Sequence, residues 1–472
     1  MHDDIAYLGA ADLAAKYRAR ELSPVEVVGA LLERAEELNP QLNALVTPMP
    51  GVEERARDAE VALARGDDLS PLHGVPFTIK DSFDTAGVRT TRGSRLFADH
   101  VPERDAVVVA RLVDAGGIPL AKTNLPDLAL WWETDSLVFG RTRNPWDLER
   151  SAGGSSGGEA AAVAAGLSPL GIGSDLGGSI RLPAHYCGVV GLKPTHGRVP
   201  VTGHWLPDVL QRFLHAGFLA RSVADVSLAL SQTAGSDGED PYAPPVPAPE
   251  PSSDGRLRPG LRVGLITSAF GPVEPEVIGL VERAGQALVE LGASVEPASF
   301  PALERHDWNT TTMTLYGGGG GAQFGRVIAG RHDELHPALR QRLGKRVESL
   351  DDYVAAEEAV EELRAGSSRF FLAYDVLLCP TVPRPAHRHD ADELEIAGET
   401  YPPRTAMRAT IPWDISGSPA LTVPFGLSSE GLPLGVQLVG RHFDEPTLFA
   451  AGHALEQARG PLRHPALVWP RP

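Results

Sequence analysis

The sequence is poor in the residues and segments that staple a protein or anchor it to a membrane. Its 472 residues include two cysteines, Cys187 and Cys379, so a disulfide framework is excluded and a reducing compartment is expected. No apolar run approaches the roughly 20 residues that span a bilayer. The first four residues are acidic and have no apolar core, unlike a secretory signal. These absences predict a cytoplasmic protein without a membrane anchor.

Positive charge is scarce as well. Lys and Arg total 43 against 61 Asp and Glu, which gives a formal net charge of −18. Because such a balance repels phosphate backbones, we expect no nucleic-acid partner. Aromatic residues make up 6% and hydrophobic residues 42% of the chain, which is ordinary for a globular protein with a buried core.

Metal and nucleotide motifs are also missing. The sequence has no H-E-x-x-H and no paired cysteine ligands, and His387 and His389 stand in a Pro- and Arg-rich stretch that predicts a solvated loop. Gly171 and Gly173 lack a third glycine at the spacing of a dinucleotide fingerprint. We therefore expect neither a metal nor an organic cofactor.

The first half of the chain alternates helix-like and strand-like segments. Residues 10–38 have the pattern of one or two amphipathic helices, and residues 52–65 that of another. Short apolar runs at 73–79 and 118–121 predict buried strands, with a helical pattern at 107–116 between them. This alternation favours an α/β layer architecture.

The second half resumes the alternation after a break. Residues 241–259 are rich in Pro, Ser and Asp and predict an exposed loop. A strand pattern at 261–266 and a helix pattern at 275–292 follow. Two further buried strands are predicted at 376–378 and 420–423.

Two stretches before residue 160 carry residues suited to catalysis. Lys80 ends the apolar run of residues 73–79; a lysine there ordinarily reaches solvent, but burial would lower its pKa and make it a neutral base. Further on, Ser155 and Ser156 are flanked by glycines that permit close backbone approach. That run fits the hydrolase pattern G-x-S-x-G in two registers, a weak signal by itself.

A third stretch lies between Asp175 and Arg181. Gly177 and Gly178 stand directly before Ser179, so successive backbone N–H groups could point freely into one cavity and hold a developing oxyanion. Asp175 and Arg181 are predicted to pair and hold the loop. Taken alone, the stretch is equally consistent with a tight turn that has no chemistry.

Taken together and in this order, these stretches resemble the amidase-signature family. The likeness is dense over residues 72–230 and most specific over 153–198. Further blocks at 379–381, 416–424 and 431–440 extend it over nearly the whole chain. Two residues depart from the family pattern: Asp414 stands where many relatives carry Asn, and Phe218 stands where a proline is common.

The resemblance implies the fold and its divisions. It implies an α/β protein with a large mixed central β-sheet covered by helices on both faces, built as a single domain over residues 1–472. The signature core would span residues 72–230, with an exposed loop at 241–259, and residues 260–472 would complete the sheet and the substrate pocket. A homodimer is the base-rate expectation for such an enzyme.

The resemblance also implies the roles of individual residues. By motif position Ser179 is the nucleophile, Ser155 the bridging serine in a cis peptide bond after Gly154, and Lys80 the base. The reaction would be hydrolysis of a small-molecule carboxamide to a carboxylic acid and ammonia or an amine, through an acyl-enzyme. The oxyanion hole would be formed by the backbone amides of Leu176, Gly177, Gly178 and Ser179. The supporting residues would be Ser156, Asp175 and Arg181.

Other interpretations stay open at this point. A Ser-His-Asp hydrolase would use Ser155 or Ser156 with a late histidine, His442 or His453. A glutaminase-type subunit of a tRNA-dependent amidotransferase would act only with a partner subunit, and a non-catalytic binding protein could keep the same fold. Cys187 could be a thiol nucleophile, but it is better interpreted as a buried structural cysteine.

The motifs leave the substrate unspecified. In this family the variable parts of the chain build the pocket, so Trp131, Trp132, residues 200–215 and residues 313–324 are candidate walls. Five consecutive glycines at 317–321 predict a mobile or tightly apposed backbone.

Overall fold

A mixed β-sheet of 11 strands runs through the molecule. The computed structural model describes residues 5–66, 69–206, 208–252, 255–343 and 349–465. The strand order is β1-β3-β2-β8-β10-β9-β16-β17-β13-β11-β12. Parallel pairs lie at both ends of this order and antiparallel pairs in its middle, so the predicted mixed sheet is confirmed. The strands are β1 Leu45–Pro48, β2 Pro76–Lys80, β3 Ile118–Thr123, β8 Leu170–Asp175, β9 Val190–Lys193, β10 His215–Ala220, β11 Arg262–Leu265, β12 Ser294–Pro297, β13 Val376–Pro380, β16 Ala420–Leu427 and β17 Pro433–Gly440.

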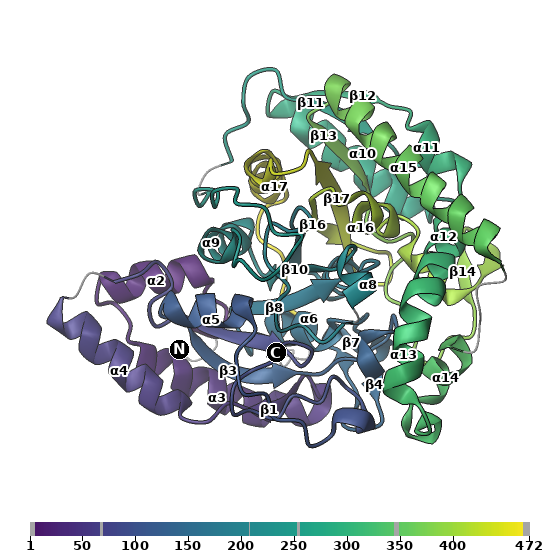
Figure 1. The fold of residues 1–472 in the computed structure, drawn as a ribbon. Helices are drawn as coiled ribbons and strands as arrows, with labels where there is room; N and C mark the ends of the chain where they lie inside the picture. The colour runs from purple at the N-terminus through teal and green to yellow at the C-terminus, as the bar shows by residue number, and fades with distance from the viewer. Residues whose placement is uncertain (1–4, 67–68, 207, 253–254, 344–348, 466–472) are drawn as a thin grey trace.

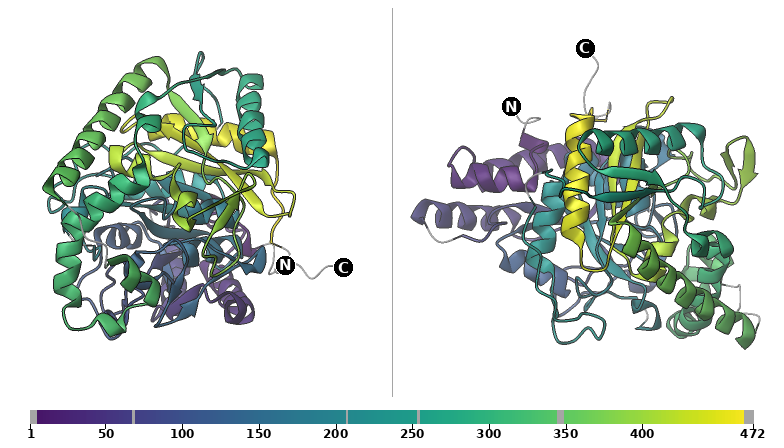
Figure 2. Two further views of the ribbon diagram at one scale, coloured as in Figure 1. Left: turned by 90° about the vertical axis from the view of Figure 1, so that its right-hand side faces the viewer. Right: turned by 90° about the horizontal axis from the view of Figure 1, so that it is seen from above.

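Apolar side chains of one strand pack on opposite faces of this sheet. Along β13, Val376 and Leu378 belong to the core that contains Leu448, whereas Leu377 and Cys379 belong to the core that contains Trp413. Because successive side chains of a strand point to opposite faces, a strand buried on both sides reads as a continuous apolar run. Figure 2 shows the yellow helix α17 (Glu445–Arg459) on one side of the strands and green helices of the 308–373 region on the other.

Helices also close the two ends of the sheet. Figure 1 places α2 (Ala10–Arg18), α3 (Pro24–Leu42) and α4 (Val52–Arg65) near β1 and β3. At the opposite end it places α10 (Pro275–Glu290) and α15 (Leu350–Ala373) near β11 and β12. The remaining helices are α5 Val107–Asp114, α6 Gly157–Ala164, α7 Arg181–Cys187, α8 Asp208–Gln211, α9 Val223–Thr233, α11 Pro301–Arg305, α12 Trp308–Leu315, α13 Gly321–Ile328, α14 Pro337–Leu343 and α16 Ile411–Ser416.

Local sequence signals account for where several elements begin. The Ser23 hydroxyl accepts from the N–H of Glu26 while the Glu26 carboxylate accepts from the N–H of Ser23, so α3 starts with a capping box and Pro24 at its first position. The five-glycine run is helical, as a π-helix over Tyr316–Gly320 followed by α13. A Cβ on Gly320 would lie 2.7 Å from Leu210 Cδ1, so the backbone is tightly apposed there.

The order of strands determines where the reactive residues meet. β2 and β8 are parallel neighbours, with Thr78 opposite Gly171 and Ile79 opposite Ile172. Their carboxyl ends therefore share one edge of the sheet, where Lys80 ends β2 and Asp175 ends β8. Among the described residues no helix is long and apolar enough to cross a membrane.

Candidate active site

Lys80 lies at the centre of this edge and is completely buried. Its Nζ atom is 2.8 Å from Ser155 Oγ and 3.0 Å from Ser174 Oγ. A third oxygen, the backbone carbonyl of Ser174, lies 3.3 Å away. The amine thus contacts uncharged oxygens, and one of them belongs to the serine predicted to bridge it to the nucleophile.

Burial determines the protonation of this lysine. Desolvation lowers the pKa of Lys80 to about 7, although the nearby carboxylates of Asp175 and Glu159 act in the opposite direction. Burial also raises the pKa of Glu159 to about 8, while hydrogen bonds from Thr78 (2.6 Å) and Thr123 (2.9 Å) lower it. A neutral amine is therefore available near neutral pH.

Ser155 follows a cis peptide bond and is buried. The Gly154–Ser155 bond is cis, as the resemblance to amidases implies. A Cβ on Gly154 would lie 2.8 Å from the carbonyl oxygen of Trp131, so only glycine fits against that segment. Ser156, the next residue, donates its N–H to the carbonyl of Ser179 at 3.1 Å and its hydroxyl to the carbonyl of Ser174 at 3.3 Å. These bonds bring the two serine loops side by side.

Ser179 sits between the end of β8 and the start of α7, with 8% of its surface exposed. Within the described residues, the hydrogen bonds of Ser179 are made by its backbone, and none joins its hydroxyl to that of Ser155. The structure therefore brings Lys80 and Ser155 into direct contact and places Ser179 on the adjoining loop.

The backbone N–H groups of this loop converge, but on a carboxylate. Gly177 and Ser179 donate to Asp175 Oδ1 at 3.2 and 2.8 Å, and Gly178 donates to the same atom. The expectation that these groups point freely into a cavity is therefore wrong for this structure, because the side chain of Asp175 folds back beneath the turn that follows it. Gly178 has φ +123°, and a Cβ there would lie 2.2 Å from Thr410 Oγ1, so the turn requires glycine.

Arg181 holds the other side of the same carboxylate. Its Nε atom donates to Asp175 Oδ2 at 2.9 Å, which confirms the predicted pair. Its Nη2 atom donates to Asp414 Oδ2 at 2.6 Å, and Nη1 donates to the Thr410 carbonyl at 2.8 Å. Arg181 and these hydrogen bonds hold the pKa of Asp175 well below its usual range despite its burial. The Ser179 loop is thus fixed by a fully buried ion pair.

Two residues of the site were missed by sequence reasoning. Ser174 contacts Lys80 from β8, and its hydroxyl lies 3.1 Å from His204 Nε2. Burial and the neighbouring Lys80 lower the pKa of His204, so this histidine is neutral. The only signal for Ser174 was its place directly before Asp175, and nothing in the sequence singled out His204 within residues 200–215.

The histidines and the cysteine considered as rivals lie in other environments. His453 Nε2 contacts the carbonyl of Ser252 at 3.3 Å, and neither it nor His442 bonds to Ser155 among the described residues. Cys187 is buried with its Sγ 3.5 Å from the Ala152 carbonyl, and burial raises the pKa of its thiol. The buried structural cysteine is confirmed.

His387 is not in a solvated loop, and that prediction is wrong. The side chain is buried, with Nε2 2.8 Å from Glu133 Oε1 and Nδ1 3.0 Å from the Tyr186 hydroxyl. Two ordered partners explain the burial of a residue from a polar stretch. Within the part of the chain that the structure describes, no three His, Cys, Asp or Glu side chains form a group that could hold a metal ion.

A cavity of about 1240 Å³ opens beside the two serine loops. Trp131 and Trp132, whose rings stack with centroids 3.8 Å apart, form part of its wall. Met313 and Thr314 line it too, whereas the described residues of 200–215 do not. The backbone of Trp131 contacts Gly154, so one wall of the cavity adjoins the Ser155 loop directly.

Known proteins resemble this chain over nearly its full length. The amidase family model matches residues 26–449. A subunit of the glutamyl-tRNA(Gln) amidotransferase from Moorella thermoacetica is 38% identical, with 96% of this chain and 97% of the relative aligned. The structure of a 6-aminohexanoate cyclic dimer hydrolase matches with a TM-score of 0.86 at 31% identity, over 98% of this chain and 99% of that one. A bacterial aryl acylamidase matches with a TM-score of 0.89 at 28% identity, over 99% of each chain. The chain therefore belongs to the amidase-signature family, whose enzymes act on carbon–nitrogen bonds.

Proposed function

We propose that this protein hydrolyses a carboxamide, with Ser179 as nucleophile and Lys80 as base acting through Ser155. The single observation that carries the proposal is the 2.8 Å contact between Lys80 Nζ and Ser155 Oγ. A buried amine whose pKa is lowered to about 7 can accept a proton at neutral pH. The similarity to named amidases over the whole chain supports the same chemistry.

The proposed reaction moves one proton along two hydroxyls. Ser179 gives its proton to Ser155 as its Oγ attacks the amide carbon, and Ser155 passes its own proton to Lys80. When the tetrahedral intermediate collapses, the carbon–nitrogen bond breaks and the proton returns along the same path to the leaving nitrogen. Water then attacks the ester on Ser179, with Lys80 again accepting the proton, and the carboxylic acid is released.

The oxyanion would be held by the backbone amides of the Leu176–Ser179 loop. Three of these N–H groups donate to Asp175 Oδ1 in the structure, so each would share its hydrogen between that carboxylate and the reacting oxygen. The Leu176 N–H makes no hydrogen bond within the described residues and would be the unshared donor. Losing one donor of this kind costs about 100- to 1000-fold in turnover.

A serine-directed fluorophosphonate tests the nucleophile. We expect the wild-type protein to be labelled at Ser179, and the Ser179→Ala variant to lose both labelling and amide hydrolysis. Ser156→Ala is the matched control, since that hydroxyl donates to the Ser174 carbonyl and does not contact Lys80. Labelling of Ser179→Ala at Ser155 or Ser156 would show that the nucleophile is another serine.

A second candidate function is that of an amidotransferase component, which would use the same site. It is favoured by the 38% identity to a protein named as a subunit of a glutamyl-tRNA(Gln) amidotransferase. The expectation of a small amide substrate without a nucleic-acid partner therefore stays a prediction. Turnover of simple amides by the purified chain, without ATP or a partner, supports the amidase; turnover of glutamine only after a partner protein is added supports the amidotransferase.

The remaining expectations belong to the same proposal. The nucleophile, relay and base are all side chains of this protein, so we propose that no cofactor takes part in the reaction. We further propose one domain over residues 1–472, a cytoplasmic location and a homodimer. Light scattering coupled to gel filtration measures the last of these directly.

A further inference from the structure

We propose that the cavity beside the serine loops binds a carboxylate of the substrate, through the guanidinium groups of Arg404 and Arg408. The inference rests on the proposed amidase function and deepens it. It names the substrate class as amides that carry a second, anionic group away from the scissile bond.

The cavity adjoins both loops of the candidate active site. Trp131 and Trp132 line it, and their backbone packs against Gly154, next to Ser155. On the other side, a Cβ on Gly177 would lie 3.0 Å from Met407 Cε, which places the segment of residues 403–408 against the Ser179 loop. A substrate held at Ser179 can therefore extend into this space.

Arg404 lines the cavity with neutral partners only. Its Nη2 donates to Thr312 Oγ1 at 2.9 Å, its Nε to Asn309 Oδ1 at 3.3 Å, and its Nη1 to Met313 Sδ at 3.0 Å. Within the described chain it forms no ion pair. Burial without a bonded carboxylate lowers the pKa of Arg404 to about 10. The guanidinium is held in place but its charge is not neutralised.

Arg408 lies one helical turn further along and lines the same cavity. Its Nε atom is buried and has no hydrogen-bond partner in the described structure, and no ion pair involves its side chain there. A buried donor without an acceptor is costly, and an anionic ligand would supply the missing acceptor. Two unneutralised guanidiniums on one wall match the forked geometry of a carboxylate.

The arginines outside this cavity show what a purely structural role looks like. Arg181 is paired with two buried aspartates, and Arg212 is paired with Glu357. Arg221 donates to three backbone carbonyl oxygens, of Val163, Ser168 and Leu8. Arg404 has neither a carboxylate nor a carbonyl among its described partners.

The carboxylates that line the cavity are occupied by or directed to other groups. Asp307 caps α12, accepting from the N–H of Asn309 and the hydroxyl of Thr310. Asp352 accepts from the Ser349 hydroxyl at the start of α15. Asp392 is exposed to solvent. None of the three forms an ion pair with Arg404 or Arg408 in the described structure, so both cations remain for a ligand.

Binding to the inactive Ser179→Ala variant tests the inference separately from turnover. The probes are succinamate, glutaramate and adipamate, each compared by calorimetry with the uncharged amide of the same chain length: butanamide, pentanamide and hexanamide. We expect at least one charged amide to bind about 10-fold more tightly than its neutral partner. Adding Arg404→Gln should weaken its binding by about 10- to 100-fold and leave the neutral amide unchanged.

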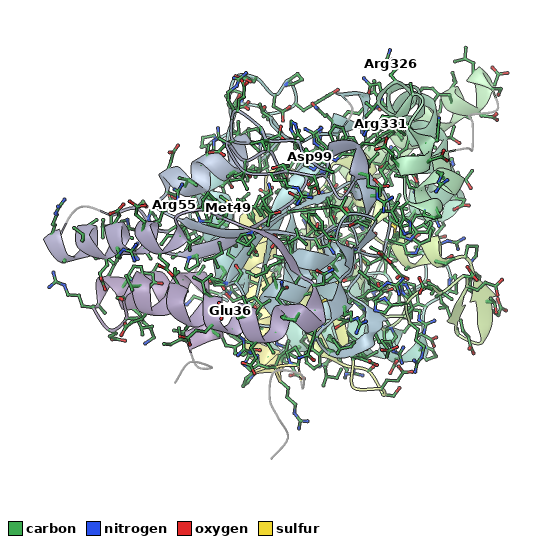
Figure 3. All side chains as sticks on the ribbon, turned by 90° about the horizontal axis from the view of Figure 1, so that it is seen from below. Glu36, Met49, Arg55, Asp99, Arg326 and Arg331 are labelled. Carbon is green, nitrogen blue, oxygen red and sulfur yellow. The ribbon has the colours of Figure 1, made fainter. Side chains whose placement is uncertain are left out.

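Three further variants make the test decisive. Arg408→Gln should show a smaller loss of the same selectivity, and Arg404→Lys should keep part of it if Arg404→Gln folds poorly. Arg326→Gln, at an exposed position on α13 (Figure 3), is the control and should change nothing. Equal binding of charged and neutral amides, or no binding of either, overturns the inference, as does unchanged selectivity in both glutamine variants. Selective binding by Ser179→Ala with no turnover by wild-type protein would instead refute only the proposed amidase function.

Discussion

Two buried lysines of the central sheet have similar acidities but different surroundings. Lys80 ends β2 and Lys193 ends β9, both are fully buried, and burial lowers the pKa of each to about 7. Lys80 contacts the hydroxyls of Ser155 and Ser174, whereas Lys193 donates to the carbonyl of Pro194 at 3.1 Å. Acidity alone would therefore select both as catalytic bases. The contact with a hydroxyl that leads to a nucleophile distinguishes them.

Replacing each lysine with methionine gives the largest expected difference. We expect Lys80→Met to lower kcat/KM for a simple amide by about 10³- to 10⁴-fold, because the general base is lost. Lys193→Met removes an equally buried amine and should lower kcat/KM by less than about 10-fold, since a buried charged group can often be replaced by an apolar one. Circular dichroism checks that both variants are folded. Equal losses in the two variants would mean that burial, and not contact with Ser155, explains the effect of Lys80.

The carboxylate that influences both lysines gives the next largest effect. Asp175 raises the pKa of Lys80 and of Lys193, and it also orders the Ser179 loop. We expect Asp175→Asn to lower kcat by about 100-fold, because one oxygen can no longer order three N–H groups and pair with Arg181. Breaking that buried pair should also lower the free energy of unfolding by about 3 kcal/mol, which urea denaturation measures. Wild-type kcat in this variant would show that the loop orders itself without the carboxylate.

The pH profile separates the two lysines more finely. Only neutral Lys80 can accept a proton, and its pKa is lowered to about 7, so protonation disables the enzyme below that pH. We expect kcat/KM to fall about tenfold per pH unit on the acid side and to level off above neutrality. The same acid limb should persist in Lys193→Met and be absent from the residual activity of Lys80→Met. Loss of the limb in Lys193→Met would assign the titration to the wrong lysine.

The smallest expected effect concerns the carboxyl group beside Lys193. Burial raises the pKa of Asp414 well above its usual value, so this group is protonated at moderate pH. We expect Asp414→Asn to change kcat/KM by less than about threefold, since Asn has the shape of a protonated Asp and keeps an acceptor for Arg181. It would also restore the residue that many relatives carry. A large loss would indicate that Asp414 acts as an anion.

Much of this fold could be predicted because its signals are local. Continuous apolar runs predicted β2, β3, β11, β13 and β16, and the capping residues around Ser23 predicted the start of α3. Element ends were less accurate: the predicted helix at 107–116 ends at Asp114, and the predicted strand at 118–121 continues to Thr123. The five-glycine run was misleading, since packing against Leu210 stabilises a helix that glycine disfavours by itself.

The candidate site could be predicted only in part. The glycines around Ser155 and Ser179 and the position of Lys80 were enough to single out these three residues, and the Asp175–Arg181 pair followed from their spacing. Ser174 and His204 could not be found, because a serine and a histidine have no distinctive pattern until the fold brings them to Lys80. His387 was misjudged for the same reason: its partners Glu133 and Tyr186 lie far away in the chain.

The sequence alone determined the family, the order of strands and helices, and the residues available for chemistry, because these depend on local pattern and on motif order. The tertiary structure alone decided what those residues touch. It buried Lys80 beside Ser155, turned the loop amides onto Asp175 rather than into a cavity, and left Arg404 and Arg408 facing an open cavity without a carboxylate. Contacts of this kind join residues tens to hundreds of positions apart, so they depend on how the sheet closes and not on any single segment.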